Sequence, residues 1–245
     1  KSDKMTLIRS FLIIFLFFLI GINAAGVEVQ LDKAPIDTRD NDSIKRGAQS
    51  FVHYCLTCHG ASFMRYNRHQ DVGFTSQELL DNIIQTGQKV GDLMVSAMKK
   101  NEAEGWFGVA PPDLSVIARS RGADWLYTYL RSFYRDETTA TGWNNLIFDK
   151  VAMPHVFYEL QGQQILKVKS LGDGKESKTL ELTVPGSIPK AEYDKFVADL
   201  VNYMVYLGEP HAAHRVDLGI KVMLFLFAML GLTYLLYKEY WRDIH

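Results

Sequence analysis

The hydrophobic pattern separates two apolar segments, one near each end of the 245-residue chain, from a mixed body between them. The first is a run of twelve residues, 11–22, which follows Lys4 and Arg9 and precedes small residues. A basic start, a short apolar core and a small-residue end are typical of a secretory signal peptide. A spanning helix needs about 20 apolar residues. We therefore predict a signal peptide over residues 1–25, of which 1–4 precede the first methionine, with a retained membrane anchor as the alternative.

The second apolar segment, residues 218–237, is twenty residues long and carries one charge, Lys221, near its start. This length matches the hydrocarbon core of a bilayer. Aromatic residues follow at its far end, as in an interfacial belt: Tyr234, Tyr237, Tyr240 and Trp241. We predict a transmembrane anchor over 215–240, with a buried core helix as the alternative. Because a signal peptide directs the following residues outward, 26–214 would be extracytoplasmic and 241–245 a cytoplasmic tail.

The body begins with a polar, acidic stretch, residues 26–42, which has no period and predicts an extended lead-in. A helix is expected from Ser43. Gly47, Phe51 and Cys55 would lie on one face of it, because they are spaced by four residues.

Further helices are predicted along the chain. Thr75 and Glu78 form a capping-box pair ahead of an apolar run, and residues 91–98 are a shorter candidate. Two helices are expected after the rigid Pro111-Pro112 break, with Asp113 as an N-cap.

The last part of the body contains little periodicity over 137–164 and then a change of period. Alternating residues in 165–184, around Asp173-Gly174, predict a β-hairpin with a long tip. Residues 191–207 predict a helix, and one stripe of it is apolar: Phe196, Leu200, Met204 and Leu207. The body is therefore expected to be mainly α-helical with long loops.

Composition excludes some functions. The formal net charge of −1 leaves no basic surplus, so we predict no nucleic-acid partner. No glycine-rich phosphate loop is present in the sequence, which argues against a nucleotide-binding enzyme.

The chain has two cysteines, Cys55 and Cys58, and His59 follows directly. C-x-x-C-H is the attachment signature of c-type haem, in which both thiols bind the porphyrin and the histidine binds the iron. We therefore predict one covalently bound haem c. Disulfide exchange is an alternative, but it usually accompanies a thioredoxin-like βαβ pattern. A zinc site would need further ligands, and neither His53 nor His69 completes a standard pair.

The pattern leaves the second axial ligand open. Met153 lies in a loop before Pro154, which would stiffen the segment that holds sulfur over iron. His155 is a rival, and packing in the loop is the other interpretation of Met153. The remaining candidates in the body are Met64, Met94, Met98 and Met204, and the last three are more simply core residues.

Two further features bear on a haem pocket. The other ring nitrogen of His59 needs a hydrogen-bond acceptor, and a carbonyl held by Pro111-Pro112 would supply it. Arg119 and Arg121 are candidates for haem propionates, with solvated helix charges as the alternative interpretation.

Together these residues resemble the cytochrome c1 family. The resemblance rests on the ordered motifs "YCLTCHG", "APPDLS" followed by "ARSRG", "AMPHVFYELQG", and a single C-terminal span after "GEPHAAHR". It implies a mainly α, class I cytochrome c-like haem domain with long loops, a small β-hairpin and one C-terminal transmembrane helix. Gly47 and Phe51 would pack where the first and last helices cross, against Phe196 and Leu200.

The resemblance also implies the ligand set. Cys55 and Cys58 would hold the haem, and His59 and Met153 would bind its iron. Arg121 is favoured over Arg119 for a propionate. Pro111 and Pro112 would form part of the haem pocket. No catalytic residue is expected, because electron transfer needs no nucleophile or general base.

The implied function is that of an electron-transfer subunit of ubiquinol–cytochrome c reductase, the cytochrome bc1 complex. The haem c would accept an electron from the Rieske iron–sulfur protein and pass it to a cytochrome c. Cytochrome b and a dimeric complex are the implied partners. The haem domain would lie on the periplasmic side of a bacterial inner membrane. The alternatives are another anchored cytochrome c, such as an oxidase subunit, and a haem enzyme with an open sixth site.

Overall fold

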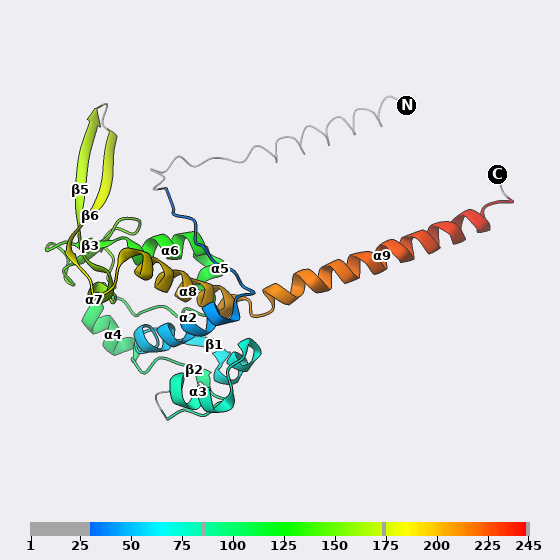
Figure 1. Ribbon diagram of the computed structural model, residues 1–245, viewed down its shortest axis with the longest axis horizontal. Helices are drawn as coiled ribbons and strands as arrows, with labels where there is room; N and C mark the ends of the chain where they lie inside the picture. The colour runs from blue at the N-terminus through cyan, green and yellow to red at the C-terminus, as the bar shows by residue number, and fades with distance from the viewer. Residues whose placement is uncertain (1–29, 85–86, 173–174, 244–245) are drawn as a thin grey trace. The chain divides into compact units, whose positions relative to one another are not determined.

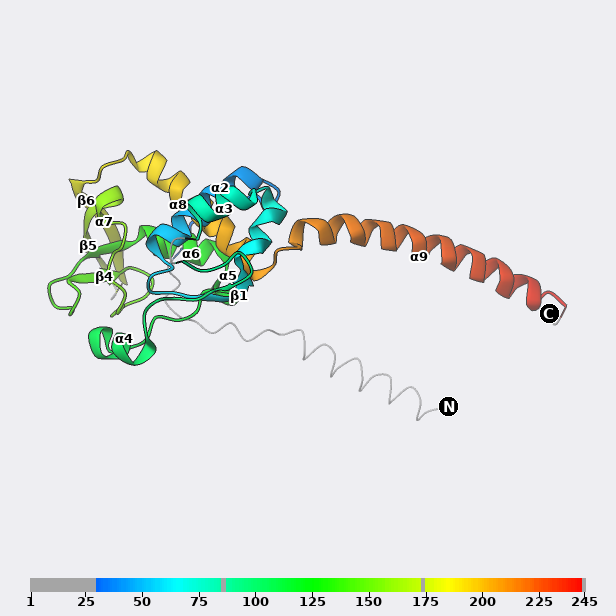
Figure 2. The same cartoon turned by 90° about the horizontal axis from the view of Figure 1, so that it is seen from below.

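The computed structural model describes residues 30–84, 87–172 and 175–243. Two helices, α2 (Asn41–Tyr54) and α8 (Lys190–Gly208), pack side by side in the body (Figure 1, Figure 2). α2 begins two residues before the predicted Ser43, because the side chain of Asp40 caps it by accepting a hydrogen bond from the Ser43 amide at 2.9 Å.

The close approach of α2 and α8 depends on Gly47. A Cβ atom at this position would lie 2.7 Å from the Cβ of Tyr203 and closer still to the carbonyl oxygen of Asp199. One turn further on, the rings of Phe51 and Tyr203 meet with centroids 5.4 Å apart. The predicted close packing of Gly47 and Phe51 against the last helix is therefore confirmed. Leu200 is fully buried there.

The other predicted partner, Phe196, lies at the opposite end of the contact. It meets the ring of Tyr54, with centroids 5.7 Å apart. Beside the crossing, Arg46 donates two hydrogen bonds to the carboxylate of Asp199, at 2.6 and 3.0 Å.

Shorter helices surround this pair. They are α3 (Ser76–Asn82), α4 (Lys100–Phe107), α5 (Ile117–Arg121), α6 (Ala123–Arg131), α7 (Tyr158–Gln161) and the 3-10 helix η1 (Tyr66–Val72). The predicted capping box is confirmed, since Thr75 and Glu78 exchange hydrogen bonds at the start of α3. α4 was not predicted, since little in its sequence is apolar and only Ala103 is buried.

Two predictions of local structure are wrong. Residues 91–98 are not a helix. Leu93–Met94 instead form the strand β2, which pairs with β1 (Ala61–Arg65), because Met94 can be fully buried there. Asp113 does not cap a helix either: α5 starts later, with Val116 at its N-cap. The carboxylate of Asp113 is used in a loop contact described below.

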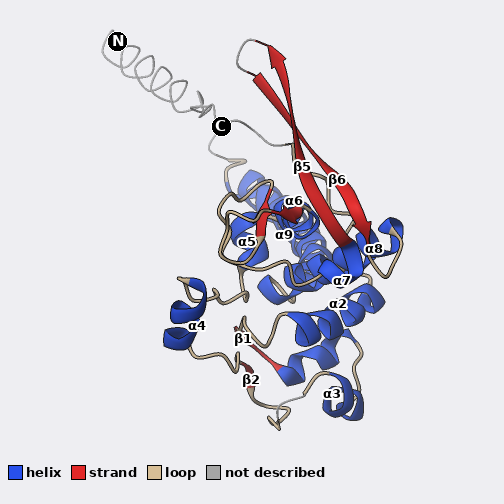
Figure 3. Cartoon of the chain, turned by 90° about the vertical axis from the view of Figure 1, so that its left-hand side faces the viewer, coloured by secondary structure: helices blue, strands red, loops and turns tan. Residues whose placement is uncertain are grey.

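The predicted β-hairpin is confirmed, although its strands are longer than expected. β5 (Gly162–Gly172) pairs antiparallel with β6 (Lys175–Pro185) and extends beyond the helices (Figure 3). Pairing continues as far as Gly172 and Lys175, so the connection is two residues and not a long tip. Near its base lies a second pair, β3 (Phe133–Arg135) with β4 (Trp143–Asn145).

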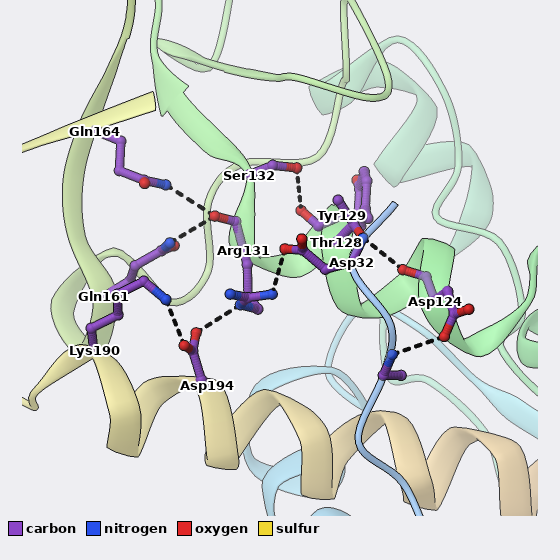
Figure 4. A network of polar contacts seen from close by, with 11 residues as sticks. Asp32, Asp124, Thr128, Tyr129, Arg131, Ser132, Gln161, Gln164, Lys190 and Asp194 are labelled. Carbon is purple, nitrogen blue, oxygen red and sulfur yellow. Dashed lines mark hydrogen bonds and ion pairs between the residues drawn. The ribbon is translucent and has the colours of Figure 1, made fainter. Parts of the chain in front are cut away.

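Arg131, at the end of α6, connects these elements (Figure 4). Its guanidinium donates to Asp194 of α8 at 2.7 Å and to Asp32 of the lead-in at 2.8 Å. Its backbone carbonyl accepts from the side chains of Gln161 and Gln164. The lead-in, α6, α8 and the base of the hairpin are thus fastened at one residue.

The C-terminal helix α9 runs over Ala212–Tyr240. Within the described residues it is the one helix that is long and apolar enough to cross a membrane, with a mean hydropathy of 2.0 over its best window. Its side chains are exposed, unlike those of a core helix, which supports a single-pass anchor. The proposed signal peptide lies outside the described residues, and the boundaries at 25, 214 and 240 stay predictions.

Candidate functional site

The C-x-x-C-H motif forms a tight turn at the end of α2. The amides of Cys58 and His59 both donate to the carbonyl of Cys55, at 3.1 and 2.7 Å. Cys55 is buried and Cys58 is half-buried, and both are free thiols. The turn therefore presents two thiols and an imidazole from five consecutive residues.

The orientation of His59 is set by a backbone carbonyl. Its Nδ1 lies 2.7 Å from the carbonyl oxygen of Pro112, 53 positions further along the chain. If Nδ1 carries the proton and donates it to this carbonyl, Nε2 keeps its lone pair for a metal. Burial lowers the pKa of His59, although Pro112 and Asp113 act in the opposite sense. The lowered pKa favours the neutral imidazole, and the contact expected from the Pro111-Pro112 segment is made by Pro112.

The segment that carries this carbonyl is fixed to the motif by Asp113. Its carboxylate accepts hydrogen bonds from the amide and hydroxyl of Ser62, at 2.8 and 2.6 Å, and from the amide of Ser115 at 2.9 Å. The Leu114 amide donates to the carbonyl of Gly60 at 2.8 Å. Burial acts to raise the pKa of Asp113, but the hydrogen bonds from Ser115 and Ser62 outweigh it and lower that pKa.

The thiols do not have the character of redox or zinc thiolates. Burial raises the pKa of Cys55 to about 12, and burial also raises the pKa of Cys58. Reactive cysteines have lowered pKa values instead. Among the described residues no group of three His, Cys, Asp or Glu side chains is placed to hold a metal ion. The geometry thus supports neither disulfide exchange nor a zinc site.

Met153 lies in a second aromatic cluster. Its side chain is half-buried against Phe133, Trp143 and Val151, and its Sδ accepts a hydrogen bond from the hydroxyl of Tyr129 at 3.5 Å. Burial raises the pKa of that hydroxyl, so it stays protonated.

The rival ligand His155 is enclosed by the same cluster. It is 2% exposed and stacks on Phe133, with ring centroids 5.0 Å apart and planes 2° apart. Trp143 packs edge-on against it at 5.0 Å. Burial lowers the pKa of His155 to about 4, with Gln161 acting in the opposite sense. Because His155 is enclosed and Met153 is only half-buried, Met153 is favoured over His155 as the candidate ligand.

Met94 and Met204 are core residues, as predicted, whereas the prediction for Met98 is wrong. Met94 and Met204 are buried in the main core at 0% and 3% exposure. Met98 is half-buried outside any helix, in the loop after β2. Met64 is also buried in the main core, at 3% exposure. Of the two half-buried thioethers, Met98 and Met153, Met153 is favoured because it packs against the second aromatic cluster.

Arg119 and Arg121 differ in their partners. Arg119 lies 4.0 Å from the carboxylate of Glu209. Arg121 has no carboxylate partner among the described residues, and its guanidinium lies over the ring of Trp125, 5.2 Å from the centroid. Arg121 is therefore the arginine that remains available for an anionic group.

Sequence reasoning missed two residues between Arg121 and Met153. Trp125 and Tyr129 stack at 4.8 Å with planes 12° apart. Both lie in α6 and are four residues apart, so this i, i+4 aromatic pair was visible in the sequence.

These residues fit a covalently bound haem c. Two free thiols, an imidazole whose tautomer is fixed by a carbonyl, a thioether in a partly apolar cluster and an arginine without a carboxylate partner form the donor set that this group uses.

Comparison with known proteins gives the family. Residues 32–244 match the model of the cytochrome C1 family. The chain belongs to the cytochrome c1 family. Members of this family carry a covalently bound haem c and are electron-transfer subunits of the cytochrome bc1 complex. The predicted family, fold class and cofactor are thereby confirmed.

Three individual proteins resemble the chain along most of its length. A protein of Nitrosomonas europaea named ammonia monooxygenase gamma subunit is 64% identical over 98% of this chain and 100% of its own. The cytochrome c1 of Allochromatium vinosum is 43% identical over 91% of this chain and 93% of its own. The cytochrome c1 of Rhodospirillum rubrum is 26% identical over 84% and 83%.

Proposed function

We propose that this chain is the haem c subunit of a quinol–cytochrome c reductase, in which it accepts an electron from the Rieske iron–sulfur protein and passes it to a cytochrome c. The observation that carries the proposal is the hydrogen bond between His59 Nδ1 and the Pro112 carbonyl, directly after the two thiols. That contact would orient the imidazole for iron. A disulfide or a purely structural turn would not require an oriented imidazole.

The proposal assigns a role to each site residue. Cys55 and Cys58 form thioethers with the haem, and His59 and Met153 bind its iron. Arg121 pairs with a propionate, and Pro112, next to Pro111, fixes the His59 tautomer. The haem supplies a one-electron carrier.

The residues of the chain set the conditions for electron transfer. With His59 and Met153 both holding the iron, the bound haem would be closed to small molecules, and the thioether of Met153 would favour its reduced state. The apolar cluster around Met153 keeps water away from the sulfur. No residue is proposed to make or break a covalent bond during turnover, so the chain has no enzyme activity outside its complex.

The membrane topology is part of the same proposal. Residues 1–25 act as a signal peptide, 26–214 lie in the periplasm, 215–240 cross the bacterial inner membrane and 241–245 face the cytoplasm. The exposed apolar side chains of α9 would then contact lipid and cytochrome b within a dimeric complex.

The test is purification from native membranes in mild detergent, followed by a redox difference spectrum. We expect haem b absorption together with the haem c band, and quinol oxidation that antimycin inhibits. Haem c alone, at full occupancy, would contradict membership in this complex and point to a free-standing anchored cytochrome.

The ligand assignment has its own test. Met153→Leu removes the sulfur and leaves the rest of the cluster apolar, so the reduced haem should bind carbon monoxide, which the unchanged protein should not. A Met98→Leu variant is the matched control, and it should exclude carbon monoxide. If Met153→Leu excluded it as well, Met153 would not be the ligand.

One comparison favours a second candidate. The relative from Nitrosomonas europaea is named a subunit of ammonia monooxygenase, so this chain is alternatively proposed to assemble with such an enzyme. The same purification decides between the two. Copurified ammonia-oxidising activity without haem b would support the second candidate and contradict the first.

A further inference from the structure

The hydroxyl of Tyr129 lies 3.5 Å from the Sδ of Met153 and donates a hydrogen bond to it. We propose that this hydrogen bond persists when the sulfur binds iron and that it raises the reduction potential of the haem. Tyr129 would then be a positioning residue that tunes the thioether ligand. The inference rests on the proposed role of Met153 as axial ligand.

Packing around the Tyr129 ring keeps its hydroxyl pointed towards the Sδ of Met153. Trp125 stacks on one side, with planes 12° apart, and Phe133 packs edge-on at a centroid distance of 5.1 Å. Its backbone carbonyl accepts from the side-chain amide of Asn145 at 2.8 Å. Because the ring is held by these two aromatic contacts and through its backbone, the hydroxyl cannot turn away without disturbing the cluster.

The sulfur has room for this donor. A thioether sulfur carries two lone pairs, so one can bind a metal while the other accepts a hydrogen bond. Among the described residues, Tyr129 makes the one hydrogen bond to Met153, and the side chain of Met153 packs against the cluster of Phe133, Trp143 and Val151. In such apolar surroundings a single hydrogen bond is electrostatically stronger than in water.

The direction of the effect follows from charge. A hydrogen bond draws electron density from the sulfur, which weakens its donation to iron. The ferric state carries one more positive charge and needs that donation more than the ferrous state does. The ferric state is therefore destabilised relative to the ferrous one, and the potential rises. Removal of the hydroxyl should lower the potential.

The experiment uses Tyr129→Phe in the haem-loaded full-length chain, purified in its complex. We expect a lower midpoint potential than in the unchanged protein and a shifted far-red charge-transfer band of the methionine-ligated ferric haem. The matched control is Tyr127→Phe, which removes a hydroxyl from the same helix. The Arg131 guanidinium carbon lies 4.3 Å from the centroid of the Tyr127 ring, and Tyr127 makes no hydrogen bond to Met153. The haem of the Tyr127→Phe variant should therefore keep its midpoint potential and its far-red band.

Two results would overturn the inference: a Tyr129→Phe potential equal to that of the unchanged protein, or an equal decrease in both variants. Failure of the underlying ligand assignment gives a different result. In that case Met153→Leu would leave the haem spectrum unchanged and exclude carbon monoxide, whatever the potential of Tyr129→Phe. The two failures are therefore distinguishable.

Discussion

Replacement of Gly47 by alanine is expected to force α2 and α8 apart. The new Cβ would lie 2.7 Å from the Tyr203 Cβ and 2.8 Å from the Asp199 carbonyl carbon, whereas real Cβ contacts are essentially never under 3.0 Å. The atoms in the way belong to backbone or to a Cβ, so no side-chain rotation relieves the overlap. The helices must instead separate by roughly 1 Å, in a core that is close-packed.

The magnitude follows from two opposing terms. Overpacking of a core costs up to about 3 kcal/mol. Alanine regains about 1 kcal/mol relative to glycine in a helix interior. Gly47→Ala should therefore lower the free energy of unfolding by about 2 kcal/mol. With an m-value of about 2 kcal/mol/M, the urea midpoint falls by about 1 M.

The assay is urea unfolding of the haem-loaded full-length chain in mild detergent, followed by circular dichroism. Gly105→Ala is the matched control, because Gly105 lies in α4 with no atom within 4 Å of the added Cβ. Its midpoint should rise, by up to about 0.5 M, since only the helix term acts. An unchanged or higher midpoint for Gly47→Ala would refute the reasoning that the glycine is required by close approach.

Three further outcomes are expected. Arg131→Met breaks two ion pairs at a side chain only 16% exposed and should cost about 2 kcal/mol in urea unfolding. Asp32→Asn, at a carboxylate that is 60% exposed, should lower the free energy of unfolding by under about 1 kcal/mol. Equal decreases for Arg131→Met and Asp32→Asn would contradict the role of Arg131 as the residue that joins these elements. Thr75→Ala removes the cap of α3 and should cost about 1 kcal/mol locally, measured as faster amide exchange in residues 76–82. Burial opposes ionisation of Asp113, but its hydrogen bonds prevail and lower its pKa below the ordinary 3.8. The stability from Asp113 is therefore present above that pH and is lost as the pH falls through the folded-state value, so Asp113→Asn should flatten the acid limb of a stability–pH profile.

Several elements were predictable because their causes lie close together in the sequence. The C-x-x-C-H motif is five consecutive residues, and the capping box of Thr75 and Glu78 spans four. The hairpin was recognisable because its alternation is interrupted at Asp173-Gly174. Among the candidate ligands, only His59 could be identified from its sequence position, because it directly follows the second cysteine of the motif.

Other features depended on contacts between distant residues. Residues 91–98 have helical spacing, but Met94 is buried by pairing with Ala61, which local pattern does not contain. Asp113 has the composition of an N-cap, yet its carboxylate is taken by Ser62, 51 positions away. In both cases a long-range hydrogen bond or burial outweighed a local preference worth about 1 kcal/mol or less.

The sequence by itself determined the covalent chemistry, the long helices and the apolar span, because each is encoded by residues within a few turns of one another. The tertiary structure decided which carbonyl meets His59, which arginine lies over Trp125 and which hydroxyl reaches Met153. Those choices depend on how separate segments pack, and packing is settled by shape and burial over the whole domain rather than by local spacing.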